Sequence, residues 1–265
     1  MYYLYKKTVT ITGVNTGIGF HIANFLIVRG FTLYGIGRKT NYLLDNSKSF
    51  NFIYADFLKT FSIKNLIIAL KASVSINNAG FASLSYLYES TEASLYRQLN
   101  VMLTLTFSLA SLSYRKLNND YTSVFINSLA SVYPIPFMGT YNICKSGLTG
   151  LYRSLDLENK KGGTSYFNFL LGDVKTRFNF KLKSYTPEAS FFIKKNKRVC
   201  EALDYSIEKA PQPYEIALTI VKHLSTKFYG GEYTVSGFNQ KTLTTLGTPL
   251  SWAFTKRFLV KYYGI

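Results

Sequence analysis

Three side chains near the middle of the chain have the types and spacing to move a proton at a carbonyl oxygen. Tyr141 and Lys145 lie four residues apart in a segment with helical spacing, so they share one helix face. A phenol with a pKa of ~10 is a poor acid at neutral pH, and a nearby ammonium favours its ionised form. Ser128 ends an expected strand, where its hydroxyl could polarise the same oxygen. Singly, such a serine is usually a cap and such a pair usually lies on the surface.

A glycine-rich turn near the start of the chain is the second chemical signal. Gly13, Gly17 and Gly19 separate a β-branched segment, residues 8–12, from residues 20–28, which have helical apolar spacing. Glycines alone are weak evidence, because they occur wherever a chain bends sharply. A strand, a glycine turn and a helix N-terminus, however, place backbone N–H groups where they can hold a pyrophosphate. Together with the serine, tyrosine and lysine, the turn indicates a dinucleotide-dependent reductase.

The ends of the next two expected strands bear on the choice of dinucleotide. Residues 31–37 end at Arg38 and Lys39, where many NAD-binding chains carry Asp or Glu. A ribose 2′-phosphate requires a cation there, so Arg38 favours NADP(H); the alternative is a solvated arginine in a turn. Residues 51–54 lead to Asp56, whose carboxylate would either accept from the adenine amino group or cap the next helix.

Helical and strand patterns alternate along the rest of the chain. Helices are expected over 62–72, 96–114 and 139–158, and strands over 74–76, 123–127, 166–171 and 233–235. The strand over 74–76 runs into Asn78, Ala79 and Gly80, small residues that would let a cofactor approach the carboxyl edge of the sheet. Alternating strands and helices predict one α/β domain, doubly wound around a mainly parallel sheet of seven strands.

Composition limits the remaining possibilities. A chain of 265 residues, 47% of them hydrophobic, is long and apolar enough for one sizeable core. Its net charge of +17 either follows from a biased composition or serves to attract phosphate-bearing partners such as an anionic membrane surface. No recognisable DNA- or RNA-binding module accompanies the charge, so nucleic acid is not an expected partner. Two cysteines without a CxxC pair predict free thiols and no zinc site. No secretory signal or bilayer-spanning segment is expected.

In this order, the motifs resemble those of the short-chain dehydrogenase/reductase family over nearly the whole chain. The matching residues are Thr12 to Gly19, Asn77 to Gly80, Asn100, Ser128 and Tyr141 to Lys145. The resemblance implies a Rossmann-type fold and a site in which Tyr141 donates a proton and Ser128 holds the substrate oxygen. It further implies that Lys145 binds the nicotinamide ribose and lowers the tyrosine pKa, while Asn100 holds a water.

The same resemblance implies the cofactor contacts and two departures. The implied cofactor-binding residues are Gly13, Asn15, Thr16, Gly17, Ile18, Gly19, Arg38, Asp56, Asn78, Ala79, Gly80, Tyr141, Lys145 and Thr176. The usual Pro-Gly after the sixth strand is Leu171-Gly172 here, although Thr176 is kept, and the segment between the third and fourth strands is short. Family members often pair through the helix that carries Tyr and Lys, which implies a homodimer or homotetramer.

Two regions outside the shared motifs bear on the substrate. Residues 173–213, where the family carries its substrate lid, combine phenylalanines with basic side chains, which suits a greasy substrate. The NADP-binding domain is expected over residues 1–239, and residues 240–265 are expected to form a basic, aromatic tail. Pro249 can start a helix in that tail with an aromatic stripe at Phe254, Phe258 and Tyr262, which would lie on a membrane, on the core or on another subunit.

The lid and tail resemble those of the 3-ketosphinganine reductases, which are members of the same family located at the endoplasmic reticulum. This resemblance rests on residues 210–219 and on the length and aromatic ending of the tail. It implies NADPH-dependent reduction of a long-chain ketone at the cytoplasmic face of that membrane. The alternatives are a soluble cytoplasmic 3-oxoacyl or hydroxysteroid-type reductase, and a non-catalytic NADP-binding sensor, for which the altered Leu171-Gly172 loop argues.

Overall fold

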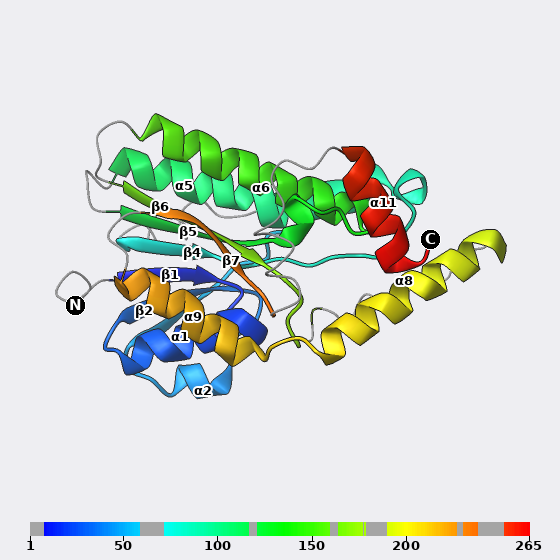
Figure 1. The fold of residues 1–265 in the computed structure, drawn as a ribbon. Helices are drawn as coiled ribbons and strands as arrows, with labels where there is room; N and C mark the ends of the chain where they lie inside the picture. The colour runs from blue at the N-terminus through cyan, green and yellow to red at the C-terminus, as the bar shows by residue number, and fades with distance from the viewer. Residues whose placement is uncertain are drawn as a thin grey trace.

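Seven strands form one sheet in which every neighbouring pair is parallel, as predicted (Figure 1). The structure is a computed structural model that describes residues 8–58, 72–116, 121–159, 164–176, 178, 190–226, 230–237 and 252–265. The strands are β1 (Thr8–Thr12), β2 (Thr32–Gly37), β3 (Phe50–Tyr54), β4 (Val74–Asn77), β5 (Tyr121–Ser128), β6 (Thr164–Leu171) and β7 (Gly231–Val235). Their spatial order is β3-β2-β1-β4-β5-β6-β7.

The order reverses direction between β1 and β4. From β1 the chain moves outward to β2 and β3, then returns to β4 on the other side of β1 and proceeds to β7. In an open parallel sheet, such a reversal opens a crevice outside the carboxyl ends of the two central strands, because the connections leave in opposite directions. The glycine turn after β1 and the asparagines after β4 therefore meet at one place.

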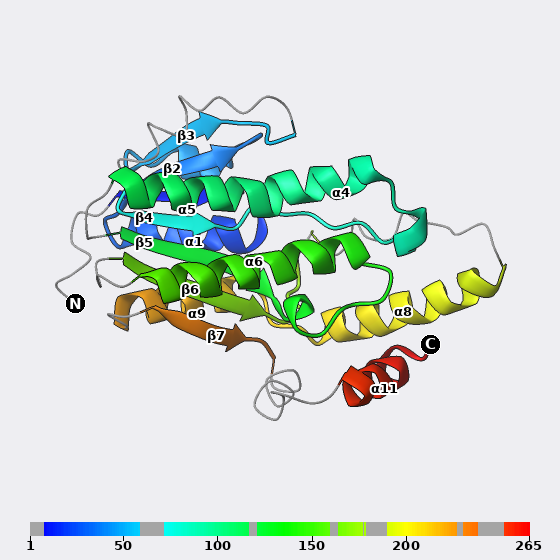
Figure 2. The same ribbon diagram turned by 90° about the horizontal axis from the view of Figure 1, so that it is seen from above.

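Helices cover both faces of the sheet (Figures 1 and 2). One face carries α1 (Gly17–Val28), the short α2 (Tyr42–Asp45) and α9 (Pro213–Thr226), and the other carries α4 (Glu92–Leu99), α5 (Leu105–Lys116) and α6 (Gly139–Glu158). Nearly every residue of the central strands β1, β4, β5 and β6 is buried, as helices on both faces of the sheet require, although β1 and β4 alternate polar and apolar side chains. Ile11, Ile22 and Ile220 are completely buried between the sheet, α1 and α9, while Phe125 and Leu148 belong to a cluster beneath α6.

Two further helices lie beyond the carboxyl edge of the sheet. These are α8 (Ser190–Glu208), in the predicted lid, and α11 (Trp252–Tyr263), in the predicted tail; they lie side by side (Figures 1 and 2). Short 3₁₀ segments, η2 (Leu87–Glu89) and η4 (Leu129–Ser131), flank the same edge. The expected helix over 62–72 and the boundary between residues 239 and 240 fall in stretches outside the described residues, apart from Ala72.

The predicted single helix over 96–114 is wrong in two respects. It begins earlier, at Glu92, because the Thr91 hydroxyl caps it by accepting from the Ser94 N–H at 3.2 Å. It is also interrupted by a π-helical turn, η3 (Asn100–Thr104), before α5 continues. Such turns are rare and occur often at functional sites. Side-chain periodicity cannot reveal this turn, because the apolar spacing continues through it.

Candidate active site

The predicted tyrosine and lysine pair, Tyr141 and Lys145, is buried in α6, above the end of β5. Tyr141 is 8% and Lys145 is 6% exposed. The Lys145 Nζ donates to the Ile126 carbonyl at 2.8 Å and lies 5.5 Å from the centre of the Tyr141 ring. The predicted shared helix face of the two residues is therefore confirmed. The end of β5 supplies the acceptor that a buried ammonium requires.

Ser128 joins this pair from the end of β5. Its side chain is hydrogen-bonded to that of Tyr141. The same Ser128 hydroxyl accepts from the Ala130 N–H at 3.1 Å and so caps η4. The capping role and the catalytic role are thus compatible, because a hydroxyl has two acceptor lone pairs and one donor. The serine, tyrosine and lysine converge as the sequence predicts.

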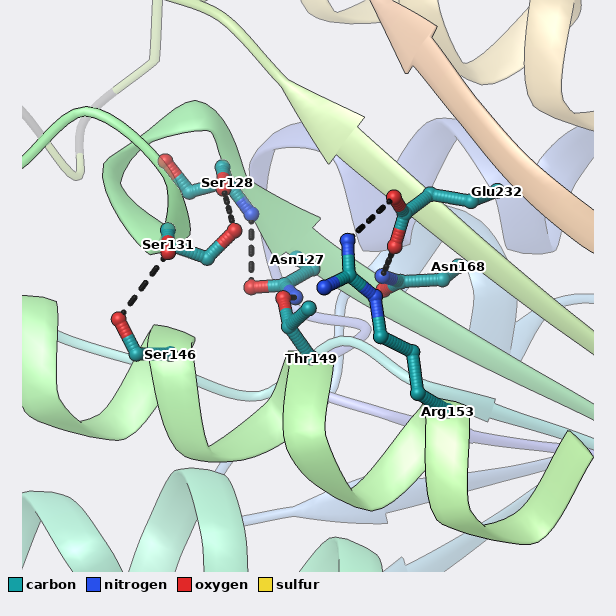
Figure 3. A network of polar contacts seen from close by, with 8 residues as sticks. All are labelled: Asn127, Ser128, Ser131, Ser146, Thr149, Arg153, Asn168 and Glu232. Carbon is teal, nitrogen blue, oxygen red and sulfur yellow. Dashed lines mark hydrogen bonds and ion pairs between the residues drawn. The ribbon is translucent and has the colours of Figure 1, made fainter. Parts of the chain in front are cut away.

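Polar contacts fix α6 against the sheet in the register that this convergence requires (Figure 3). The Asn127 amide donates to the Thr149 hydroxyl at 2.9 Å, and the Ser146 hydroxyl donates to the Ser131 carbonyl at 3.1 Å. Farther along the helix, Arg153 pairs with Glu232 of β7 at 3.1 Å, and the buried amide of Asn168 donates to the other oxygen of that carboxylate at 2.8 Å. Residues of β5 and β7 therefore hold the helix, and Asn168 of β6 orients the β7 carboxylate.

The pKa of Tyr141 does not follow the expectation that the lysine lowers it. Burial raises this pKa to about 12; the Ser128 hydrogen bond acts to lower it, and the charges of Asp173 and Cys144 act to raise it. Desolvation prevails because the phenolate would lie in a dry pocket. In the chain alone, the phenol is therefore protonated at neutral pH, which is the state that a proton donor needs.

Burial also changes the titration of the two residues beside the tyrosine. It lowers the pKa of Lys145 to about 8 and raises that of the Cys144 thiol to about 11. The Cys144 side chain is completely buried, and the thiol is free, as predicted. A lysine pKa near 8 lets the ammonium release or regain a proton close to physiological pH.

The glycine turn after β1 is packed directly against the segment after β4. A Cβ at Gly19 would lie 2.3 Å from the Gly13 carbonyl and 2.4 Å from the Asn78 amide nitrogen. That amide donates to the carbonyls of Thr12 and Gly13 at 2.9 and 3.0 Å. The Thr12 hydroxyl accepts from the backbone N–H groups of Asn78 and Ala79. Sequence reasoning noted Thr12 only as part of a motif and missed this double acceptor.

The turn fits the pyrophosphate of a dinucleotide. Thr16 is the N-cap of α1 but makes no side-chain cap bond, and the first turn holds no acidic residue, so N–H groups and the positive dipole end are available to an anion. Gly13 and Gly17 have φ angles of +74° and +62°, which a side chain would strain. The Thr176 side chain lies over Gly17, at 3.5 Å from the position of a Cβ there.

The other predicted cofactor residues surround this turn. The Asn15 carbonyl accepts from the Asn41 side chain at 3.0 Å, an anchor that sequence reasoning missed, and Ile18 packs against the main core. Arg38 is exposed directly after β2. One Asp56 oxygen accepts from the Leu58 N–H at 3.1 Å. Gly80 is exposed at the same edge.

Asn100 occupies the first position of the π-helical turn. Its carbonyl accepts from the Leu105 N–H, and its side chain is exposed. The structure thus brings it to the turn that precedes α5 without a described contact to Lys145. Its assignment as the holder of a water remains a prediction.

The tail packs on the apolar side of this site. Leu259 and Tyr263 of α11 belong to the buried cluster that contains Tyr141 and the α8 residues Val199 and Leu203. The side chains of the lid, the tail and the proton donor therefore form one continuous apolar wall. Of the three placements that the sequence left open for the tail, packing on the core accounts for this face.

The predicted aromatic stripe of the tail helix is not the face that packs. Phe254 and Tyr262 are 55% and 44% exposed, and Phe258 is partly buried. The Arg198 guanidinium donates to the Gly264 carbonyl at 2.9 Å and helps to set the rotation of α11 against α8. Tertiary contact with α8 selects the neighbouring face, which periodicity within the tail cannot foresee.

The fold and this site define a nucleotide-dependent oxidoreductase. The model of the short chain dehydrogenase family matches residues 7–185, more than half of the chain, and the chain belongs to this family. A short-chain dehydrogenase from Streptomyces avermitilis superposes with a TM-score of 0.76 at 19% identity, covering 100% of this chain and 97% of that one. An alcohol dehydrogenase from Thermococcus sibiricus, complexed with 5-hydroxy-NADP, gives 0.69 at 21% identity, covering 88% and 97%.

The curated relatives are named for different substrates. A 3-ketodihydrosphingosine reductase of Bacteroides thetaiotaomicron is 26% identical over 57% of this chain and 58% of its own length. An NADPH-dependent 1-acyldihydroxyacetone phosphate reductase of Saccharomyces cerevisiae is also 26% identical, over 71% of this chain and 67% of its own. The aligned part thus spans less than two thirds of the first relative.

Replacing Gly19 by alanine tests the phosphate seat. Gly19→Ala should lower affinity for NADPH at least about 10-fold, because the new methyl group displaces the Gly13 carbonyl or the Asn78 amide. Gly150→Ala on α6 is the matched control, since nothing lies within 4 Å of a Cβ there. Fluorescence titration with NADPH measures both. Equal affinity in the two variants would contradict the assignment.

The buried lysine predicts a pH dependence of stability. Because its pKa is about 8 in the folded chain and 10.5 ordinarily, the unfolded state binds more protons between these values. The cost of burying the ammonium is complete below pH 8 and declines as pH rises. The free energy of unfolding should therefore rise relative to that of Lys145→Met by about 2 kcal/mol between pH ~8 and ~10.

Denaturant unfolding across this range measures the difference. Lys256→Met, at an exposed position of α11, is the control and should give a curve parallel to that of the wild type. A Lys145→Met curve parallel to the wild type would show that burial of the ammonium carries no such cost.

Proposed function

We propose that the protein reduces a ketone to an alcohol with NADPH, and that its substrate is a hydrophobic lipid such as 3-ketosphinganine. The observation that carries the reaction is the convergence of Ser128, Tyr141 and Lys145 beside a glycine turn suited to a pyrophosphate. A protein relieved of catalysis would have little reason to keep all three, which argues against the non-catalytic sensor.

The residues of the chain divide the work. Tyr141 gives its proton to the ketone oxygen, and the Ser128 hydroxyl holds that oxygen. Burial keeps the phenol protonated until it is needed, and the Lys145 ammonium stabilises the negative charge left on the phenol. With the pyrophosphate of NADPH held at the glycine turn, its nicotinamide would supply the hydride.

A lipid substrate is supported by the wall of the site and by one relative. The cluster shared by α8, α11 and Tyr141 offers apolar surface beside the reacting groups. The Bacteroides relative is named for a long-chain keto base, whereas other relatives are named as 3-oxoacyl reductases. A soluble 3-oxoacyl or hydroxysteroid-type reductase is therefore the second candidate.

The cellular setting is part of the same proposal. Among the helices of the described residues, none is long and apolar enough to cross a membrane. Surface attachment at the cytoplasmic face of the endoplasmic reticulum, with the cytoplasm as the alternative, rests on the net charge of +17 and on exposed Trp252 and Phe254 of α11. Pairing into a homodimer or homotetramer rests on the family resemblance alone.

Turnover of two ketones tests the reaction and its substrate class. With NADPH, the wild type should reduce 3-ketosphinganine faster than an acetoacetyl thioester, and Tyr141→Phe should lose at least about 100-fold in kcat/KM because the proton donor is gone. Tyr214→Phe, on the opposite face of the sheet, is the control. Turnover of the thioester alone would overturn the lipid assignment, and full activity of Tyr141→Phe would overturn the mechanism.

The exposed arginine after β2 predicts the cofactor preference. Arg38→Asp should reduce the preference for NADPH over NADH by about 10- to 100-fold, because a carboxylate repels the 2′-phosphate. Arg29→Asp makes the same charge change at the far end of α1 and should leave the preference unchanged. Dissociation constants for both cofactors measure it. A wild type that binds NADH and NADPH equally would refute the preference.

A further inference from the structure

The loop that follows β6 places one carboxylate at the catalytic edge. Leu171 ends β6 and pairs in register with Ser128 of β5, so the residues that follow both strands leave the sheet side by side. Asp173 lies two residues beyond Leu171 and is half-buried. It therefore stands beside the strand end that delivers the catalytic serine.

Backbone contacts hold this loop in place. The Gly172 N–H donates to the Val235 carbonyl at 3.1 Å, and the Lys175 N–H donates to the Pro211 carbonyl at the same distance. Val174 is buried in the main core. Because its neighbours on both sides are anchored, the backbone at Asp173 is held at the edge of the site.

The carboxylate is also tied to the lid helix. The Ser206 hydroxyl of α8 donates to the Asp173 Oδ2 at 2.5 Å. Its charge reaches two buried phenols: after burial itself, Asp173 contributes to the raised pKa of Tyr141 and to that of Tyr263 on α11. The charge of Asp173 thus acts both on Tyr141 and on a tyrosine of the tail helix.

A carboxylate at this place is unusual for the chain as a whole, which carries 31 basic and only 14 acidic residues. Beside the proton donor, it selects substrates by charge. It attracts a cation near the reacting ketone and repels an anion such as a phosphate. An amino group on the carbon next to the ketone would bring such a cation to this edge of the site.

We infer that Asp173 binds the amino group of an α-amino ketone and thereby selects this class of lipid over ketones of the same length without the amine. The inference rests on the proposed function, because it concerns the substrate of the same site. The carboxylate holds the amine as its ammonium, and the apolar wall of α8 and α11 takes the hydrocarbon chain.

The test compares 3-ketosphinganine with its 2-deamino analogue, which keeps the ketone, the hydroxyl and the chain. The ratio of kcat/KM for the two substrates should be about 10 to 100 in the wild type, and Asp173→Asn should bring it close to one. Asp156→Asn, exposed on α6, should keep the wild-type ratio. Ser206→Ala, which removes the hydrogen bond but leaves the charge, should keep most of it.

Each contrary result has its own meaning. The inference fails if the wild type reduces both ketones equally, or if Asp173→Asn lowers both rates by the same factor, because the carboxylate then does not bind the amine. The reductase assignment would still stand. If the wild type reduces neither ketone, the proposed function itself fails. Should Asp173→Asn not fold, binding of sphinganine to the wild type and to Ser206→Ala, compared with that of the deamino alcohol, decides: equal affinities overturn the inference.

Discussion

Burial of an ammonium and a phenol side by side is the constraint on which this structure depends. Lys145 can lie 6% exposed because the Ile126 carbonyl accepts from it, and that carbonyl is available only where β5 ends beneath α6. The same dry environment raises the pKa of Tyr141 and lowers that of Lys145. The chain therefore holds a protonated phenol beside an amine that titrates near neutrality.

The rest of the fold serves to keep this arrangement and the nucleotide seat at one edge. Contacts from Asn127 at β5 and Glu232 of β7 fix the rotation of α6 (Figure 3). The Asn78 amide joins the end of β4 to the turn after β1. A parallel sheet brings these residues together, because the carboxyl ends of all its strands lie at the same edge. Gly19 is as necessary as any catalytic residue, since no side chain fits between the two segments.

The helices of the lid and the tail pack together beside Tyr141. α8 supplies both the hydrogen bond to Asp173 and the apolar residues on which α11 packs. A polar group and an apolar wall thus approach the proton donor from the same element. A rearrangement of α8 would therefore change both contacts together.

The sequence by itself determined the class of fold and which residues we propose to react, because both rest on local rules. Strand and helix periods, the glycine turn and the spacing of Tyr141 and Lys145 operate within a few residues of chain. Tertiary structure alone decided the raised pKa of the phenol, the packing face of α11 and the meeting of Asp173 with Ser206. These depend on desolvation and on contacts between segments far apart in the chain, which no local pattern records.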